Sequence, residues 1–351
     1  MSLCEVRIPT YKRPDLLRRA LSSLVEQSYP NWQAIVFDDS PEKEAQNVVS
    51  DFEDNRILYK PNEKNLGGLK NIDYAFSSKG YLGGTYAFVL EDDNYLFPDF
   101  IAENIHSLET NRVGIVLRNQ EIGLEKYGDS VPTGETTRGL WFEQGIYTPF
   151  EIHARLFFNE SISNGGLFWH TGKIRSNLQV GSQAIHFPYQ EILRAWLIKE
   201  PIYFEAKPLC VFTGFYREKN NDEPLHSRFY RRYKSLMGAP QHNRGTQAIL
   251  KHLIDTYGTA IVQESRRLAI ERDEERTFER QLLSVRYLNY QFRKLNRLEI
   301  ARYLITYGLR YYLFKNPLKN FLTTVQSQES DVTSYWTKQD ELSQTGERSS
   351  E

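Results

Sequence analysis

Short apolar runs alternate with helix-like patterns through the first 90 residues, and this alternation constrains the fold more than any other feature. Strand-like runs occupy residues 5–9, 33–37, 56–60 and 86–90, and helical periodicity occupies residues 16–27, 42–52 and 69–77. Strands separated by helices usually pair in parallel and are covered on both faces. The sequence therefore predicts an α/β domain with a Rossmann-like, mostly parallel sheet and helices on both faces.

The rest of the chain divides into a continuation of this domain and a helical extension. Further short strand-like runs, at residues 113–117, 202–204 and 209–212, are expected to complete the same sheet, so we place the domain at residues 1–227. Helical patterns at residues 246–257 and 260–283 predict a helical C-terminal extension over residues 228–322. Residues 323–351 are polar without apolar periodicity, and we expect them to be disordered.

Composition narrows the functional classes. The formal net charge is -1, which does not fit a general nucleic-acid binder, so no nucleic acid is expected as a partner. Cys4 and Cys210 are far apart and form neither a disulfide framework nor a paired zinc motif. No leader pattern opens the chain, and no stretch approaches the roughly 18 apolar residues of a membrane span. We therefore expect a cytoplasmic protein.

Polar clusters follow three of the predicted strands. They lie at residues 9–13, 38–40 and 91–94, and in an open α/β sheet such carboxyl ends converge on the ligand crevice. The acids Glu91, Asp92 and Asp93 repel one another unless a cation lies among them, and their oxygens suit Mg²⁺ or Mn²⁺. The alternative is a solvated turn that ends a buried strand.

A second acidic pair, Asp38 and Asp39, ends the strand at residues 33–37. A carboxylate in this place can accept from a base N–H or a ribose hydroxyl. The same residues also suit an ordinary turn or helix cap. Together with the cluster at residues 91–94, they favour nucleotide binding.

Four motifs in order resemble the family 2 glycosyltransferases of the GT-A fold. They are Val6-Arg7-Ile8-Pro9-Thr10-Tyr11-Lys12-Arg13-Pro14, Asp38-Asp39-Ser40, Asn65-Leu66-Gly67-Gly68 and Glu91-Asp92-Asp93-Asn94. The resemblance is firm to about residue 105 and thinner to about residue 216. It implies a nucleotide-binding half at residues 1–110 and an acceptor half at residues 111–227.

The resemblance also implies roles for single residues. The residues implied to bind the nucleotide-sugar donor are Pro9, Thr10, Tyr11, Arg13, Asp39, Asn65, Lys70 and Asp92. Asp93 is the leading metal ligand, with Asp92 beside it, because Glu91 stands where the family commonly has an aspartate. The implied cofactor is Mn²⁺ or Mg²⁺, and the favoured donor is a UDP-sugar.

An inverting transfer needs a base for the proton of the acceptor hydroxyl, and a carboxylate suits that task. The resemblance points to an acid that opens a helix after the metal motif, where the chain has Gln190-Glu191, so Glu191 is the predicted catalytic base. The alternative is a first-turn acid that the helix dipole favours.

Two further features are candidates for contacts with the acceptor and the metal. Gly165 and Gly166 would let the backbone approach a sugar, and Trp169 offers a flat apolar face for its ring. Aromatic residues in such a run are more often core residues. His226 resembles a loop histidine that approaches the metal or the diphosphate, although a histidine on a polar loop is usually just solvated.

Residues 286–319 are rich in basic and aromatic side chains and follow an amphipathic helical pattern. This pattern suits the surface of an anionic membrane, where lipid-linked acceptors are found, so peripheral contact with the inner face is one expectation. The alternative is that the aromatic face packs on the catalytic domain or on another subunit of a homo-oligomer.

The leading hypothesis is an inverting glycosyltransferase that adds one sugar from a nucleotide-sugar to a hydroxyl of a glycan or lipid-linked acceptor, in bacterial-type cell-surface glycan or glycolipid synthesis. A sugar nucleotidyltransferase is an alternative, but residues 9–14 lack the glycines that usually cradle a triphosphate. A glycan-binding scaffold without catalysis is another, because a fold does not guarantee a function.

Overall fold

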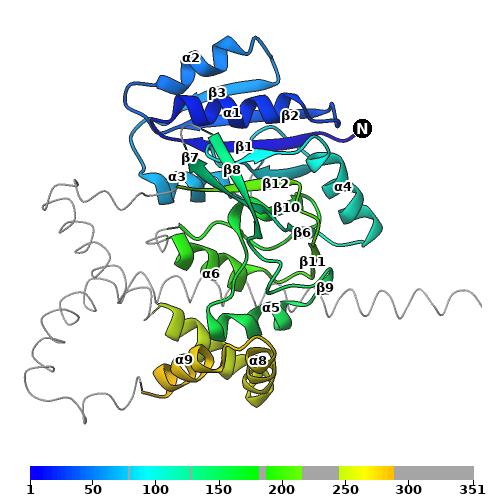
Figure 1. Cartoon of the computed structure of the whole chain (residues 1–351), viewed down its shortest axis with the longest axis vertical. Coiled ribbons are helices and arrows are strands. Elements are labelled where there is room, and N and C mark those ends of the chain that lie inside the picture. Colours follow the sequence, from blue (N-terminus) through cyan, green and yellow to red (C-terminus); the bar gives the residue numbers. More distant parts are fainter. Residues whose placement is uncertain (78–79, 127–128, 182–186, 216–244, 288–351) are drawn as a thin grey trace, which may run out of the picture. The chain divides into compact units, whose positions relative to one another are not determined.

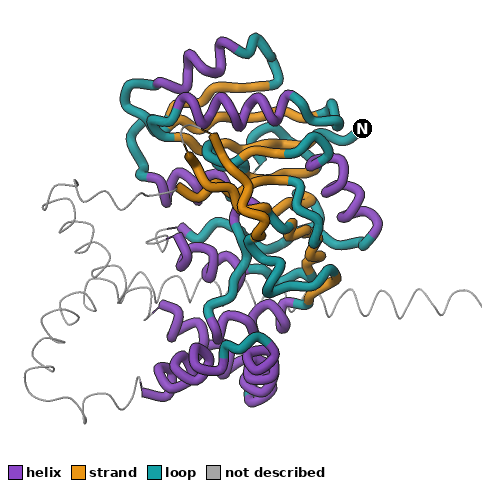
Figure 2. The backbone as a smooth tube through the Cα atoms, viewed as in Figure 1, coloured by secondary structure: helices purple, strands orange, loops and turns teal. Residues whose placement is uncertain are grey.

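The computed structural model describes residues 1–77, 80–126, 129–181, 187–215 and 245–287. These residues belong to one compact unit, in which a large mixed sheet runs through the middle and helices lie outside it (Figures 1 and 2). The order of strands in the large sheet is β3-β2-β1-β4-β10-β6-β11-β9.

The first half of the unit follows the predicted alternation. Its elements are β1 (Cys4–Thr10), α1 (Pro14–Val25), β2 (Trp32–Asp38), α2 (Glu44–Asp51), β3 (Ile57–Pro61), α3 (Gly68–Ala75) and β4 (Tyr86–Val89). Strands β3, β2, β1 and β4 pair in parallel in that order. All residues of β1 are buried, as expected for a strand that is covered on both faces.

Helix α1 shows why these residues fold locally as they do. It begins at Pro14, whose fixed φ and missing N–H suit the first turn of a helix. Its buried side chains recur with the helical period, at Leu17, Ala20, Leu21 and Leu24. They join the core beneath β1 and β2, so the loop between β1 and α1 is held at the edge of the sheet.

The second half adds antiparallel strands to the sheet. Its elements are β5 (Tyr95–Leu96), α4 (Phe100–Thr110), β6 (Ile115–Arg118), β7 (Glu121–Lys126), β8 (Asp129–Thr136), β9 (Gly145–Tyr147), α5 (Pro149–Arg155), η1 (Leu156–Phe158), η2 (Asn164–Gly166), β10 (Leu167–His170), α6 (Phe187–Leu197), β11 (Ile202–Glu205) and β12 (Cys210–Phe215). Strand β10 lies antiparallel between β4 and β6, and β11 pairs in parallel with β6. A smaller sheet has the order β5-β12-β7-β8.

Helices from the predicted extension pack on this unit. Residues 245–257 are helical, and α8 (Thr259–Glu271) and α9 (Glu275–Tyr287) follow. Helix α8 packs beside α5, and α9 packs on η1 (Figure 1). The single helix predicted over residues 260–283 is wrong, because Asp273 adopts a left-handed conformation with φ of 56° and separates two helices.

Several predictions fall on residues that the structure does not describe. These are the domain boundary at residue 227, the tail at residues 323–351 and most of the basic aromatic segment at residues 286–319. Among the helices that the structure describes, none has both the length and the apolar composition needed to cross a membrane.

Candidate active site

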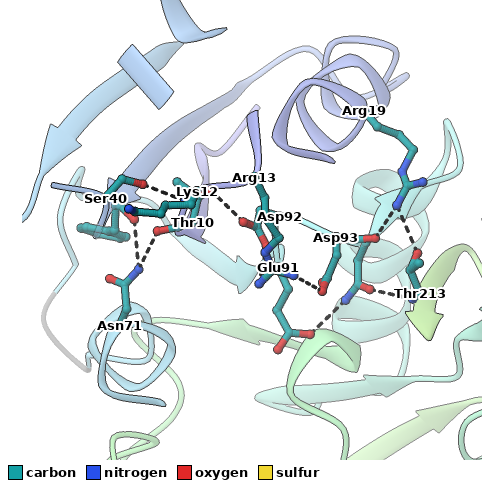
Figure 3. A network of polar contacts seen from close by, with 12 residues as sticks. Thr10, Lys12, Arg13, Arg19, Ser40, Asn71, Glu91, Asp92, Asp93 and Thr213 are labelled. Carbon is teal, nitrogen blue, oxygen red and sulfur yellow. Dashed lines mark hydrogen bonds and ion pairs between the residues drawn. The ribbon is translucent and has the colours of Figure 1, made fainter. Parts of the chain in front are cut away.

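The ends of β1 and β4 are joined by a hydrogen bond between side chains. Thr10 donates from its hydroxyl to Oδ2 of Asp92 at 2.7 Å, and the backbone N–H of Tyr11 bonds the same carboxylate. Burial raises the pKa of Asp92 to about 6, although Arg13 opposes the shift. The predicted convergence of these two strand ends is therefore seen in the structure (Figure 3).

Two arginines bind this acidic edge. Arg13 contacts Asp92 at 3.2 Å and Asp93 at 2.6 Å, so one guanidinium bridges both carboxylates (Figure 3). Arg19 on α1 donates to the backbone carbonyl of Asp93 at 2.8 Å. Arg19 carries no signal in the sequence, since its place on α1 opposite Asp93 depends on how the helix packs.

The same acids offer oxygen ligands for a divalent cation. In the part of the chain that the structure describes, no three acidic, histidine or cysteine side chains form a preformed metal cluster. Asp93 remains partly exposed and next to Asp92, and Mg²⁺ is commonly held by one or two carboxylates plus phosphate oxygens. The residues fit a cation that arrives with a phosphate ligand.

Asp39 anchors the loop that precedes α3. Its two carboxylate oxygens accept from the backbone N–H groups of Leu66 at 2.7 Å and Gly67 at 2.8 Å. The side chain of Asn65 donates to the backbone carbonyl of Asp39 at 2.9 Å. Asp39 and Asn65 thus lie together, and Asp39 holds this loop against β2.

The other predicted donor residues lie around this edge. Pro9 is buried within β1, whereas Tyr11 is 40% exposed just beyond it. Lys70 is exposed on the first turn of α3. Lys12, between Tyr11 and Arg13, adopts a left-handed conformation, and its N–H donates to Ser40 at 2.8 Å. The loops after β1 and β2 are therefore joined (Figure 3).

Glu91 faces the second half of the domain. It accepts from Asn94 at 2.9 Å, and Asn94 in turn accepts from the N–H of Thr213 on β12. Burial raises the pKa of Glu91 to about 8, and the charges of Asp93 and Glu191 add to the shift. The predicted base, Glu191, therefore lies within electrostatic reach of the acidic cluster.

The predicted glycines lie beside Glu91 but differ in role. A Cβ on Gly165 would lie 2.9 Å from the amide nitrogen of Gln120 and 3.5 Å from Oε2 of Glu91, so its missing side chain leaves room at the site. A Cβ on Gly166 would lie 2.5 Å from the carbonyl oxygen of Arg118 on β6. Gly166 thus permits close packing of the backbone.

Glu191 lies in the second turn of α6, so it is not the acid that opens this helix. Arg138 donates to Oε2 of Glu191 at 3.3 Å, and the N–H of Asn164 approaches Oε1 at 3.4 Å. Burial raises the pKa of Glu191, and Arg138 partly opposes the shift. A carboxylate with these neighbours and a raised pKa has the properties of a general base.

Buried side chains next to Glu191 fix the position of α6. Gln190 is fully buried and donates to the backbone carbonyl of Leu69 at 3.0 Å. Arg194, one turn later, forms a buried ion pair with Asp73 at 3.1 Å. Asn164 contacts the side chains of both Gln190 and Glu191, so these buried contacts also fix where the carboxylate of Glu191 lies.

A pocket of about 480 Å³ opens beside Glu191. Its walls include Arg138, Trp141, Phe158, Glu160, Ser161 and Glu191, together with Glu274 and Thr277 near and on α9. Sequence reasoning missed Trp141 and Glu160. An isolated aromatic residue and an isolated acid carry no pattern in the sequence, and only the packing of α9 on η1 brings them to one pocket.

The proposed role of Trp169 as a sugar platform is wrong. The side chain is 2% exposed, stacks on Phe76 with ring centroids 5.8 Å apart, and lies near the guanidinium of Arg7. Strand β10 lies between β4 and β6 and is covered on both faces, so its aromatic residues belong to the core. His226 lies outside the described residues.

Comparisons with known proteins agree with this architecture. Residues 5–164 match the model of Glycosyl transferase family 2. The Escherichia coli protein UDP-Glc:alpha-D-GlcNAc-diphosphoundecaprenol beta-1,3-glucosyltransferase WfgD is 25% identical over 122 residues, which are 34% of this chain and 46% of that protein. WfaP, an Escherichia coli protein described by the same activity, is 27% identical over 115 residues, which are 32% of this chain and 44% of that protein. The chain thus matches less than half the length of these curated relatives.

A solved structure resembles nearly the whole chain. The crystal structure of S. aureus TarS 1–349 covers 94% of this chain and 88% of its own, with a TM-score of 0.51 and 15% sequence identity. At this identity the likeness concerns the fold. The resemblance noted in the four sequence motifs is confirmed, and the chain carries a Glycosyl transferase family 2 domain on the GT-A fold.

Proposed function

We propose that the protein is an inverting glycosyltransferase that moves one sugar from a nucleotide-sugar to a hydroxyl group of an acceptor. The observation that carries the proposal is the placement of Glu191 close enough to Glu91, the first residue of the acidic cluster, for its charge to raise the pKa of Glu91. A donor held at the acidic edge would present its anomeric carbon toward the side of the site where Glu191 lies.

Glu191 acts as the base in this proposal. Its carboxylate takes the proton of the acceptor hydroxyl while the hydroxyl oxygen bonds to the anomeric carbon and the bond from that carbon to the diphosphate oxygen breaks. The raised pKa of Glu191 makes it a better proton acceptor than an exposed glutamate. Arg138 keeps enough of it ionised by stabilising the charged form.

The donor is assigned to the ends of β1, β2 and β4. Thr10, Tyr11 and Asp39 lie at the nucleoside end, and Arg13 and Lys70 supply positive charge for the diphosphate. Asp92 and Asp93 would hold Mn²⁺ or Mg²⁺, which when bound neutralises the charge of the departing diphosphate. UDP is the favoured nucleotide, in line with the names of WfgD and WfaP, which both specify UDP-Glc.

The acceptor is a glycan or a lipid-linked sugar, and the product belongs to cell-surface glycan or glycolipid synthesis. WfgD and WfaP are named for an undecaprenol-linked acceptor, which supports a membrane-bound substrate here. Such a substrate suits a cytoplasmic protein that contacts the inner face of the membrane through residues 286–319. A homo-oligomer built through the same segment is the alternative use of that surface.

Isothermal titration of UDP, GDP and dTDP, with Mn²⁺ and with EDTA, tests the donor site. We expect one nucleotide to bind in the presence of Mn²⁺ and binding to be lost in Asp93→Ala. The control is Asp255→Ala, which removes an exposed acid on a helix remote in sequence. If no nucleotide binds the wild-type protein with or without Mn²⁺, the transferase proposal is wrong and a glycan-binding scaffold takes its place.

The assignment of the base needs a separate variant. Glu191→Gln removes the proton acceptor but keeps the shape of the side chain, so nucleotide affinity should stay within about threefold of wild type while transfer falls by a factor of about 10² or more. Loss of nucleotide binding in Glu191→Gln would instead assign this residue to the donor site.

A further inference from the structure

The carboxyl group of Glu160 is buried without a hydrogen bond. Glu160 as a whole is 6% exposed, and neither of its carboxylate oxygens has a hydrogen-bond partner among the described residues. The nearest cation, Arg155, lies 3.8 Å from Oε2, beyond hydrogen-bond distance. Buried polar groups are nearly always hydrogen-bonded, and an unsatisfied one calls for an explanation.

The backbone around Glu160 presents this side chain to the pocket. Asn159 ends η1 in a left-handed conformation with φ of 64°, which turns the chain just before Glu160. Gln281 on α9 donates to the side chain of Asn159 at 2.8 Å, so the turn is tied to α9. Glu160 and Glu191 therefore border the same pocket of about 480 Å³.

Charges of both signs act on Glu160. Arg155, Arg138 and Arg272 stabilise the ionised form of Glu160, and Glu274 destabilises it. Burial outweighs the arginines and raises the pKa of Glu160 to about 8, so at neutral pH the group is mostly a carboxylic acid. A neutral carboxyl can donate one hydrogen bond and accept others, as sugar hydroxyls require.

Trp141 supplies the apolar surface that a bound sugar ring needs. It lines the same pocket and is partly exposed, unlike Trp169. An indole face covers the apolar face of a pyranose while polar groups at the rim bond its hydroxyls. The Nε atom of Arg138 is a further buried polar atom that has no hydrogen-bond partner among the described residues.

We infer that this pocket binds a neutral, hydroxyl-rich pyranose of the acceptor, and that Glu160 selects it by bonding one of its hydroxyl groups. The inference rests on the proposed function, since it places the acceptor sugar next to Glu191. It gives the helical extension a role in specificity, because Glu274 and Thr277 form part of the wall. Glu160 is a specificity residue that takes no part in the transfer of the proton.

The test is a titration of the full-length protein with neutral methyl hexopyranosides and methyl N-acetylhexosaminides. Saturation-transfer NMR measures the binding. Amino-sugar and sugar-phosphate analogues serve as the charged ligands for comparison. We expect neutral glycosides to bind at least about tenfold more tightly than the charged analogues. Equal or tighter binding of a charged analogue, or no binding of any neutral glycoside, would overturn the inference.

Variants connect the binding to Glu160. Glu160→Leu should weaken binding about tenfold or more, whereas Glu160→Gln, whose amide also donates and accepts, should stay within about threefold of wild type. Monodeoxy glycosides sharpen the result, since removal of the hydroxyl that Glu160 bonds should weaken binding to wild type but not to Glu160→Leu. Unchanged binding in Glu160→Leu contradicts the proposal. Glu103→Leu, an exposed acid on α4, is the matched control.

A UDP titration of the same variants separates the two proposals. If UDP binds but no glycoside does, the pocket assignment fails and the transferase proposal stands. If glycosides bind through Glu160 and no nucleotide binds, the transferase proposal fails and the pocket remains a glycan-binding site.

Discussion

Arg138 donates a hydrogen bond of 3.3 Å to Glu191 across 53 residues of sequence. The contact links the segment after β8 to the second turn of α6. Because the guanidinium stabilises the ionised carboxylate, Arg138 lowers the pKa of Glu191 against the larger effect of burial. The pair therefore sets the pH at which the proposed base becomes active.

Replacement of Arg138 should move the pH profile of transfer. If Glu191 must be ionised, kcat/KM falls as the pH drops through its pKa, and Arg138→Met raises that pKa further. The acidic limb of the profile should then move to higher pH, whereas Arg138→Lys should keep it closer to wild type. A limb that stays in place in Arg138→Met would show that another group controls it.

Removal of Arg13 should change how the acidic edge binds cations. The guanidinium neutralises Asp92 and Asp93, so a divalent cation must compete with it. In Arg13→Met we expect Mn²⁺ to bind about tenfold more tightly in the absence of nucleotide, a change of about 1.4 kcal/mol. Titration calorimetry measures this, with the exposed Arg18→Met as the control. Unchanged affinity would mean that Arg13 does not occupy the cation site.

The two adjacent glycines should respond differently to alanine. A methyl group on Gly166 would meet backbone at 2.5 Å, which cannot move away easily, so Gly166→Ala should lower the free energy of unfolding by about 1–3 kcal/mol. On Gly165 the methyl group meets side chains of Gln120 and Asn94, which can shift. Gly165→Ala should therefore keep most of its stability and lose transfer activity, because Asn94, which donates a hydrogen bond to Glu91, has to shift. Urea unfolding and activity assays distinguish the two outcomes.

The sequence predicted which residues meet on the proposed donor side of the site, because these residues directly follow strands. The alternation of strands and helices implied that residues 9–13, 38–40 and 91–94 meet, and the contacts of Thr10 with Asp92 and of Lys12 with Ser40 bear this out. The parallel order of β2, β1 and β4 brings their carboxyl ends to one edge. Periodicity alone is enough to locate such an edge.

The acceptor side could not be predicted in the same way. Trp169 and Trp141 are indistinguishable by composition, and their opposite environments follow from the insertion of β10 between β4 and β6. Glu160 becomes a pocket residue only because Asn159 turns the chain and α9 packs on η1. Such tertiary contacts leave no periodic signal in the sequence.

The buried pair of Arg194 and Asp73 should be a major contributor to stability. Asp73 also accepts from the N–H groups of Val180 and Gly181, and Arg194 lies 3.7 Å from the ring centre of Phe76. Arg194→Met leaves Asp73 charged and buried, so the free energy of unfolding should fall by about 3–5 kcal/mol. Arg267→Met, which breaks exposed ion pairs on α8, should cost less than about 1 kcal/mol. Similar losses in both variants would contradict this view.

Glu160 should make the stability of the protein depend on pH. Its pKa is about 8 in the folded state, whereas a glutamate in an unfolded chain titrates near pH ~4.3. Between these values the folded state holds a proton that the unfolded state lacks, so the free energy of unfolding decreases as the pH rises through that interval. Glu160→Gln removes this proton exchange but keeps the side-chain volume.

Glu91, Glu191 and Asp92 also have raised pKa values, so they too make the free energy of unfolding fall as the pH rises. Because they do so equally in wild type and in Glu160→Gln, the difference between the two proteins isolates the effect of Glu160. The variant should match wild type near pH 4 and gain relative stability up to about pH 8, above which the difference levels off. Urea unfolding at intervals between these pH values measures the difference. A constant difference across the range would mean that Glu160 has the same charge in the folded and unfolded protein. The three arginines around it would then offset the effect of its burial.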